Sequence, residues 1–177
     1  MELGIGHLRG AVAKLREFSD KDYAIAFITG SGLGEILDMD HVHFEIPYSQ
    51  IPFFPVSTVE GHLGKLFGGN LLGKDILLFK GRFHLYEGHK PSHIAFPIWV
   101  SKLLGAKYLF ITSASGGLNL EFRPGDLMLI KDHINLTGKN PLTGPNIEEL
   151  GTRFPDMTAA YDPSLQSLAR EVANAIG

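Results

Sequence analysis

The stretch YAIAFITGSGLG (residues 23–34) decides the class of fold. Its first half is a short, continuous apolar run, which is the pattern of a β-strand covered on both faces. Strands of this kind belong to parallel sheets, because helices cover such sheets. The strand runs straight into a glycine-rich turn. We therefore expect an α/β fold with polar loops beyond the ends of buried strands.

Outward from this stretch, helical and strand patterns continue to alternate. Apolar spacing predicts helices over 8–18, 92–104 and 162–176, with Pro97 inside the second and Asp162 as the N-cap of the third. A half-exposed strand is predicted over 41–46, buried strands over 107–112 and 126–130, and a hairpin between 61 and 80. Residues 137–155 are rich in Gly, Pro, Asn and Thr, which favours a long surface loop. Residues 1–177 are predicted to form a single domain.

Composition narrows the class of partner. The chain has 16 basic and 19 acidic residues, a net charge of −3, and no Lys/Arg run, so nucleic acid and anionic membranes are not expected as partners. Cysteine is absent, which excludes disulfides and thiolate metal sites and fits a reducing compartment. No stretch approaches the roughly 20 apolar residues of a membrane span. We expect a cytoplasmic protein that binds small molecules.

The sequence GRFHLYEGH (81–89) carries the most informative polar cluster, directly after the apolar run DILLF. If the strand continues past Gly81, then Arg82, His84 and Tyr86 lie on one face at a period of two. Arginine offers a planar fork for two oxygens of a phosphate, and His84 adds a further hydrogen-bonding group. The alternative is a surface salt bridge between Arg82 and Glu87 with a solvated His84.

Two glycine-rich turns follow the strands predicted over 23–28 and 107–112. TGSGLG (29–34) places Ser31 among glycines that allow close approach of a ligand, but its spacing is neither a Rossmann fingerprint nor a P-loop. TSASGGLN (112–119) exposes backbone N–H groups. Taken singly, each is as well explained by a tight turn.

Histidine pairs occur at 41 and 43 and at 89 and 93, but no H-E-x-x-H motif or carboxylate-rich group accompanies them. A metal site is therefore not expected. His62 is flanked by two glycines, which would let a ligand approach it, although a simple turn histidine is the alternative.

Taken together and in order, the motifs resemble those of the trimeric class of purine nucleoside phosphorylases. The resemblance runs from Gly30 to Asp162 and rests on GSGLG, VEGHLGKL, GRFHLYEGH, TSASGGLN, GDLMLIKDHINLTGKNPLTGPN and RFPDMTAAYD. Methylthioadenosine phosphorylases are similar, but they carry an Arg-His pair in place of RFH and a Thr-rich segment in place of SASGGLN. The resemblance implies an α/β, three-layer fold with a central mixed β-sheet flanked by helices.

The resemblance also implies a function: a pentosyltransferase of purine salvage that cleaves purine (deoxy)ribonucleosides with inorganic phosphate as co-substrate. It implies no cofactor and a homotrimer. The resemblance implies phosphate binding by Ser31, His62, Arg82, His84 and Ala114. It implies contact with the ribose by Tyr86 and Ala114, and a catalytic set of His84, Tyr86 and Glu87. It also implies that Phe154 contributes to the sugar pocket of the neighbouring subunit.

The chain departs from the family in length. Members run to well over 250 residues, so the resemblance implies a C-terminally truncated fold without the purine-binding segment. Apolar strands and faces are then expected to be exposed. Two hypotheses stay open at this point: an active phosphorylase, or a non-catalytic homologue that acts as a phosphate-binding or assembly module.

Overall fold

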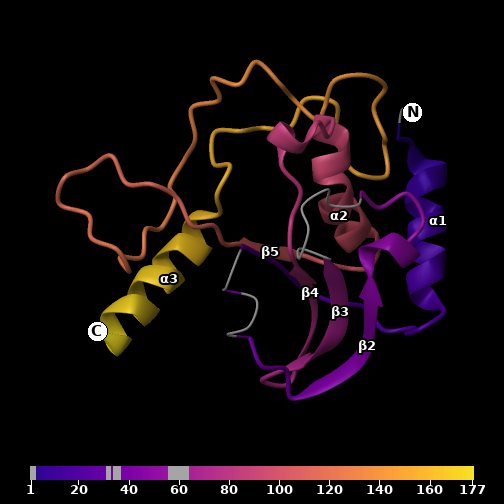
Figure 1. Ribbon diagram of the computed structural model, residues 1–177, viewed down its shortest axis with the longest axis horizontal. Helices are drawn as coiled ribbons and strands as arrows, with labels where there is room; N and C mark the ends of the chain where they lie inside the picture. Colours follow the sequence, from indigo (N-terminus) through magenta and orange to yellow (C-terminus); the bar gives the residue numbers. More distant parts are fainter. Residues whose placement is uncertain (1–2, 31–32, 34–36, 56–63) are drawn as a thin grey trace.

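The centre of the fold is a five-stranded mixed β-sheet with the strand order β2-β3-β4-β1-β5 (Figure 1). The computed structural model describes residues 3–30, 33, 37–55 and 64–177. The strands are β1 (Ile25–Thr29), β2 (His41–Pro47), β3 (Lys65–Leu71), β4 (Lys74–Lys80) and β5 (Tyr108–Ile111). β2, β3 and β4 pair antiparallel, whereas β4, β1 and β5 pair parallel. The predicted mixed α/β sheet is confirmed.

β1 is a central strand, as its continuous apolar sequence predicts. It pairs with β4 on one side and with β5 on the other. Ala26 and Ile28 are buried in the main core. Phe27, on the alternate face, stacks on Phe110 with ring centroids 5.1 Å apart. Both faces of the strand are therefore used for apolar contacts.

Two helices cover one face of the sheet. Leu8 and Leu15 of α1 (Ile5–Arg16) and Phe96 and Val100 of α2 (Pro91–Leu103) are fully buried in one cluster with Phe79 of the sheet. Of the three expected layers, the described residues show the sheet and this helical layer. The third helix, α3 (Pro163–Ile176), buries no residue and projects away from the sheet (Figure 1).

The helix boundaries agree with the sequence in most respects. α2 begins at Pro91 and continues through Pro97, whose carbonyl accepts from the Ser101 hydroxyl at 2.8 Å. Asp162 caps α3, because its carboxylate accepts from the backbone N–H groups of the two following non-proline residues. The prediction that α1 reaches Phe18 is wrong: the helix ends at Arg16, and Phe18 is largely exposed.

Two strand predictions need correction. Residues 107–112 were expected to form a buried strand, but β5 is an edge strand with all four residues exposed. Residues 126–130 form no strand and are mostly exposed. A short apolar sequence holds a β conformation where a neighbouring strand pairs with its backbone, as β1 does for β5. In the described part of the chain no strand pairs with 126–130.

The segment from Thr112 to Asp162 contains no helix or strand, in agreement with the loop predicted over 137–155. It extends away from the sheet and then returns to the helical layer (Figure 1). Ile147 and Leu150 pack on the core there. Lys102 Nζ of α2 donates to the Leu150 carbonyl at 2.6 Å, and Arg9 pairs with Glu149 at 3.2 Å.

The predicted hairpin is confirmed as β3 and β4, joined by a two-residue turn at Leu72 and Gly73. Both turn residues have positive φ, 49° for Leu72 and 75° for Gly73. A two-residue hairpin loop favours this left-handed conformation, and Asn-Gly is the sequence best suited to it. Leucine is poorly suited, because its Cβ crowds the backbone at positive φ.

We expect Leu72→Asn to raise the free energy of unfolding by about 0.5–1 kcal/mol, because asparagine tolerates positive φ. Leu72 is 84% exposed, so no buried contact is lost. Urea unfolding of the variant would measure the gain. Leu118→Asn, at another fully exposed leucine, is the control and should change stability by less than about 0.5 kcal/mol. An equal gain in both variants would show that removal of exposed apolar surface, and not turn geometry, is responsible.

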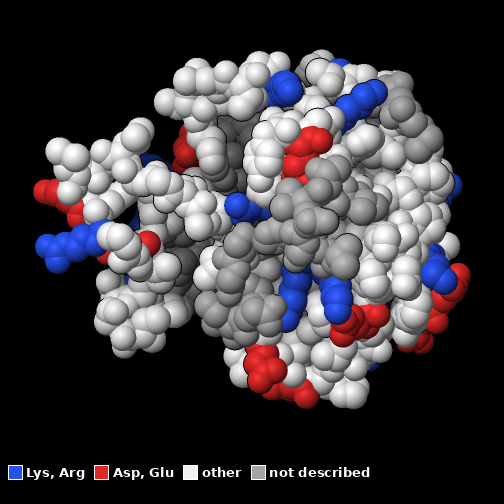
Figure 2. All heavy atoms as spheres, in the orientation of Figure 1, with Lys and Arg blue, Asp and Glu red and all other residues white. Residues whose placement is uncertain are grey.

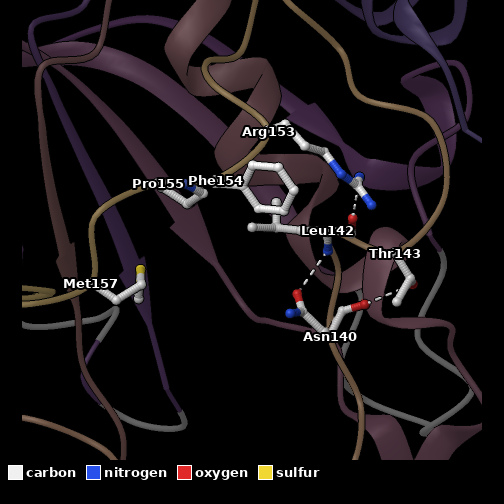
Figure 3. Close-up of a pocket in the computed structure, with 7 residues that line it drawn as sticks. All are labelled: Asn140, Leu142, Thr143, Arg153, Phe154, Pro155 and Met157. Carbon is white, nitrogen blue, oxygen red and sulfur yellow. Dashed lines mark hydrogen bonds between the residues drawn. The ribbon is translucent and has the colours of Figure 1, made fainter.

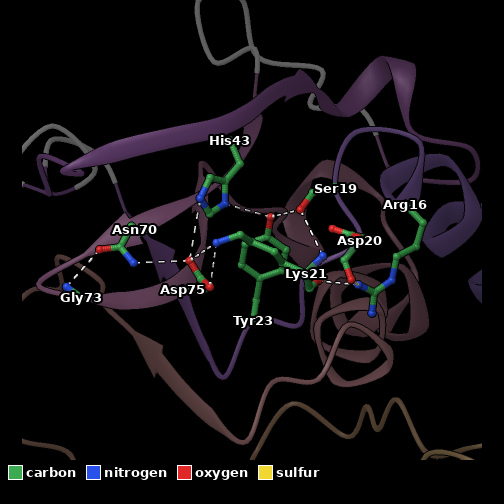
Figure 4. A network of polar contacts seen from close by, with 9 residues as sticks. All are labelled: Arg16, Ser19, Asp20, Lys21, Tyr23, His43, Asn70, Gly73 and Asp75. Atoms are coloured by element: carbon green, nitrogen blue, oxygen red, sulfur yellow. Dashed lines mark hydrogen bonds and ion pairs between the residues drawn. The ribbon is translucent and has the colours of Figure 1, made fainter.

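A polar network joins the loop before β1 to the hairpin (Figure 4). Asp75 Oδ2 of β4 accepts from Lys21 Nζ at 3.2 Å, and His43 Nε2 of β2 lies 3.8 Å from Asp75 Oδ1. The Tyr23 hydroxyl donates to Ser19 Oγ at 2.8 Å. Burial opposes ionisation of Asp75, but hydrogen bonds from Lys21 and Asn70 outweigh it and hold the pKa of this carboxyl below its usual range.

A lowered pKa in the folded state gives Asp75 a stabilising contribution that depends on pH. The contribution is complete above the ordinary carboxyl pKa of about 4 and is lost as the pH falls through the lower folded value. We expect Asp75→Asn to lower stability by about 1 kcal/mol at pH 7 and by much less in acid. Thermal unfolding between pH 7 and pH 3 measures this difference. Asp20→Asn, at an exposed carboxyl of the same loop, is the control; a destabilisation by Asp75→Asn that is equal at both pH values would contradict the assignment.

Candidate functional site

The site is built where three parallel strands end side by side. β1 is followed by Gly30, β4 by Gly81 and Arg82, and β5 by Thr112. Since β1 pairs in parallel with both β4 and β5, these three ends meet at one edge of the sheet. Ligands of α/β proteins bind at such an edge. The expectation of polar loops beyond buried strands is therefore met in the described residues.

Arg82 joins the three strand ends. Its Nη1 donates to the Thr112 carbonyl at 2.7 Å, and its Nε donates to His84 Nε2 at 3.2 Å. Gly30 lies directly beside it, because a Cβ at position 30 would come within 2.9 Å of Nη1. The Gly30 N–H in turn donates to Thr112 Oγ1 at 3.3 Å. Glycine at 30 thus leaves the space that the guanidinium occupies.

His84 is held from its other side by Glu87. Glu87 Oε1 lies 2.9 Å from His84 Nδ1 and accepts from the His84 backbone N–H at 2.9 Å. A carboxylate only accepts hydrogen bonds, so Nδ1 carries the proton and Nε2 is free to accept one. This agrees with the donation from Arg82 to Nε2. The Glu87 side chain is only 2% exposed.

The backbone of this segment differs from the expectation. β4 ends at Lys80, Gly81 has a positive φ of 101°, and Leu85–Glu87 is a 3₁₀ turn, so Arg82, His84 and Tyr86 do not share a strand face. The three are nevertheless together, because the His84 and Tyr86 rings stack with centroids 4.7 Å apart. Tyr86 is 79% exposed. The alternative of a surface salt bridge between Arg82 and Glu87 is wrong, since the Glu87 side chain is 2% exposed and contacts His84, while Arg82 donates to Thr112 and His84.

The remaining predicted residues lie elsewhere. Ala114 is exposed, two residues beyond Thr112. Phe154 lines a surface hollow of ≈ 340 Å³ with Arg153, Leu142 and Met157 (Figure 3). None of the residues around this hollow belongs to the group of Arg82, His84 and Glu87, called the Arg82 cluster below. Arg153 Nη1 holds the loop there through the carbonyls of 142 and 144. Ser31 and His62 lie outside the described residues.

Sequence reasoning missed Thr112. Its carbonyl and hydroxyl connect Arg82 to Gly30, whereas the sequence pattern and the resemblance point to residues that follow it, Ala114 among them. A signal is present in the sequence, because Thr112 is the first polar residue after an apolar run, just as Thr29 is.

The surface charge of the described residues is mixed in sign. Figure 2 shows acidic and basic side chains interspersed over the visible face, without a continuous basic area. Within the described ranges no cluster of three or more His, Asp or Glu side chains could hold a metal ion. None of the helices in these ranges is long and apolar enough to cross a membrane.

The chain belongs to the phosphorylase superfamily, whose family model matches residues 24–177. It is 54% identical over 153 residues to purine nucleoside phosphorylase 1 of Geobacillus stearothermophilus and 46% identical over 156 residues to the purine nucleoside phosphorylase of Bos taurus. These matches cover 86% of this chain in both cases, but 56% and 54% of the relatives. The chain thus spans just over half the length of the curated relatives it matches.

Solved structures give the same result. The purine nucleoside phosphorylase of Schistosoma mansoni in complex with inosine superposes with a TM-score of 0.89 at 41% identity, over 98% of this chain and 62% of that chain. Isoform 2 from the same organism, in complex with cytosine and ribose-1-phosphate, gives a TM-score of 0.89 at 43% identity, over 97% and 61%. The expected phosphorylase fold is therefore confirmed.

Proposed function

We propose that this protein is a purine nucleoside phosphorylase, which converts a purine (deoxy)ribonucleoside and phosphate into the free base and (deoxy)ribose 1-phosphate. One observation carries the proposal: the Arg82–His84–Glu87 cluster lies at the shared end of three parallel strands. Relatives named as purine nucleoside phosphorylases at 46–54% identity support it. The cysteine-free sequence supports a cytoplasmic location.

Phosphate binding follows from the hydrogen-bonding groups of the cluster. Arg82 can turn its fork from the Thr112 carbonyl and His84 onto two phosphate oxygens. His84 Nε2 then accepts from the phosphate's own hydroxyl, while Glu87 keeps the ring in position from Nδ1. Ser31, His62 and the backbone N–H of Ala114 complete the proposed phosphate site. Glu87 acts here as a positioning residue for His84.

The reaction itself needs an anion in place and no protein nucleophile. As the bond between C1′ and the purine nitrogen breaks, its electron pair leaves with the base and positive charge develops on the sugar. A phosphate oxygen held against C1′ stabilises that charge and then forms the new bond to C1′. The departing base gains one proton and the phosphate loses one, so atoms and charge balance over the reaction. Tyr86, exposed and stacked on His84, supplies one wall for the sugar.

The oligomer is proposed as a homotrimer. Phe154 is 86% exposed and lies in a hollow apart from the Arg82 cluster, which fits a role at a neighbouring subunit's sugar pocket (Figure 3). Residues 1–177 are proposed to act as one domain. A phosphate-binding or assembly module without catalysis is the second candidate.

The test is release of hypoxanthine from inosine by the purified 177-residue chain, with and without phosphate. A phosphorylase releases the base only with phosphate and forms ribose 1-phosphate in equal amount, which ³¹P NMR detects. Arg82→Ala should abolish the release. Phosphate binding without any release would instead support the non-catalytic module. Release that is independent of phosphate would contradict both.

A further inference from the structure

His89 carries a buried polar atom that finds no partner among the described residues. Within that part of the chain its Nε2 has no hydrogen-bond partner and almost no exposed surface, and the side chain as a whole is 13% exposed. A buried donor or acceptor left unsatisfied destabilises a fold by about 1–3 kcal/mol, so such atoms call for an explanation. No role for His89 follows from the sequence alone.

The surroundings of His89 direct this atom toward Glu87. Gly88, with a positive φ of 86°, reverses the chain after the 3₁₀ turn, so that His89 comes back alongside Glu87. The ring packs edge-on against buried Phe83, with centroids 5.5 Å apart. In this position Nε2 lies 3.9 Å from Glu87 Oε2, about 1 Å more than a hydrogen bond requires.

Glu87 therefore lies between two histidines. Its Oε1 contacts His84 Nδ1 at 2.9 Å, and its Oε2 faces His89. A carboxylate oxygen accepts more than one hydrogen bond, so Oε2 can accept from His89 in addition to any other partner. A small rotation of either side chain closes the gap, and polar contacts of this kind commonly tighten when a ligand binds.

We propose that His89 is a positioning residue for the phosphate site: Nε2–H of His89 donates to Glu87 Oε2 and fixes the carboxylate that holds His84. The contacts then form a continuous series from Arg82 through His84 and Glu87 to His89. The role in phosphate binding rests on the proposed function, whereas the effect of His89 on the His84 ring does not.

The first test is ¹⁵N NMR of the histidine rings in the wild-type chain. The proposal requires His89 to carry its proton on Nε2, and His84 to carry its proton on Nδ1. A His89 ring protonated only on Nδ1, with a bare Nε2, would overturn it. Because this measurement needs no substitution, it does not depend on a variant that folds.

The second test uses three variants. His89→Phe keeps a ring at this position but removes the N–H donor. In this variant the His84 ring should no longer carry its proton on Nδ1 alone. His89→Gln offers an amide N–H near the same point and should restore the Nδ1–H form. His93→Gln is the matched control, because the His93 ring also lies next to His89, with ring centroids 6.3 Å apart, and is not part of the series from Arg82 to His89. An unchanged His84 signal in His89→Phe would overturn the proposal.

Phosphate affinity separates this inference from the proposed function. If the wild-type chain binds phosphate, His89→Phe should raise its Kd roughly tenfold and His89→Gln should recover most of the loss. A wild-type chain that binds no phosphate counts against the proposed function alone, since the His84 signals still decide the role of His89.

Discussion

Lysine in place of Arg82 is expected to lower phosphate-dependent cleavage of inosine about 100-fold, the effect of losing one well-placed donor to a developing anion. Lysine keeps the positive charge, so the expected loss of activity would measure the contribution of the guanidinium's hydrogen-bonding geometry. Arg82 uses two different nitrogens, one on the Thr112 carbonyl and one on His84. A single ammonium group cannot reproduce that fork.

Steady-state kinetics with phosphate as the varied substrate would measure the effect. Arg16→Lys is the matched control, because Arg16 also donates to backbone carbonyls, those of Asp20 and Lys21, at the far end of α1. This variant should keep nearly full activity. If Arg82→Lys were as active as wild type, a general positive charge would be enough and the proposed clamp would be wrong.

Alanine in place of Phe79 is expected to lower the free energy of unfolding by about 3–5 kcal/mol. Phe79 is fully buried on β4, and its ring stacks on Phe54 with centroids 6.4 Å apart. Its carbonyl accepts from the Thr29 hydroxyl at 3.1 Å, which ties β4 to β1. A cavity here removes aromatic contacts from the strand that leads into Arg82.

Urea unfolding monitored by circular dichroism would give the loss. Phe122→Ala offers the comparison, because Phe122 is 46% exposed and lies outside the sheet and helices. That change should alter stability by less than about 1 kcal/mol. Equal losses in the two variants would contradict the placement of Phe79 in the buried core.

The parts of the fold that the sequence predicted well are those with a strong local signal. The apolar run of β1, the Gly73 turn of the β3–β4 hairpin and the Asp162 cap each specify their own conformation. Residues 126–130 show the opposite case, because they carry a strand-like sequence without a strand beside them. Exposure of β5 likewise depends on what lies next to it and not on its own residues.

At the site, residue types were predictable but their geometry was not. The pairing of arginine and histidine in GRFHLYEGH indicated an anion site, yet a regular strand was assumed where the chain makes a 3₁₀ turn. Gly81 and Gly88, both at positive φ, cause that difference. The contact of Arg82 with the Thr112 carbonyl depends on strands that are distant in the sequence, and the approach of His89 to Glu87 depends on the Gly88 turn.

The hydrogen bond from the Gly30 N–H to Thr112 Oγ1 joins residues 82 positions apart. Contacts so distant in the chain require closure of a long loop, whereas the β3–β4 hairpin closes over a two-residue turn. We therefore expect the hairpin to form early and the Arg82 cluster to assemble last. Pulse-labelled hydrogen exchange during refolding would reveal this as late protection of Gly30, and simultaneous protection of both regions would contradict it. Phosphate would then recognise only molecules that have finished folding.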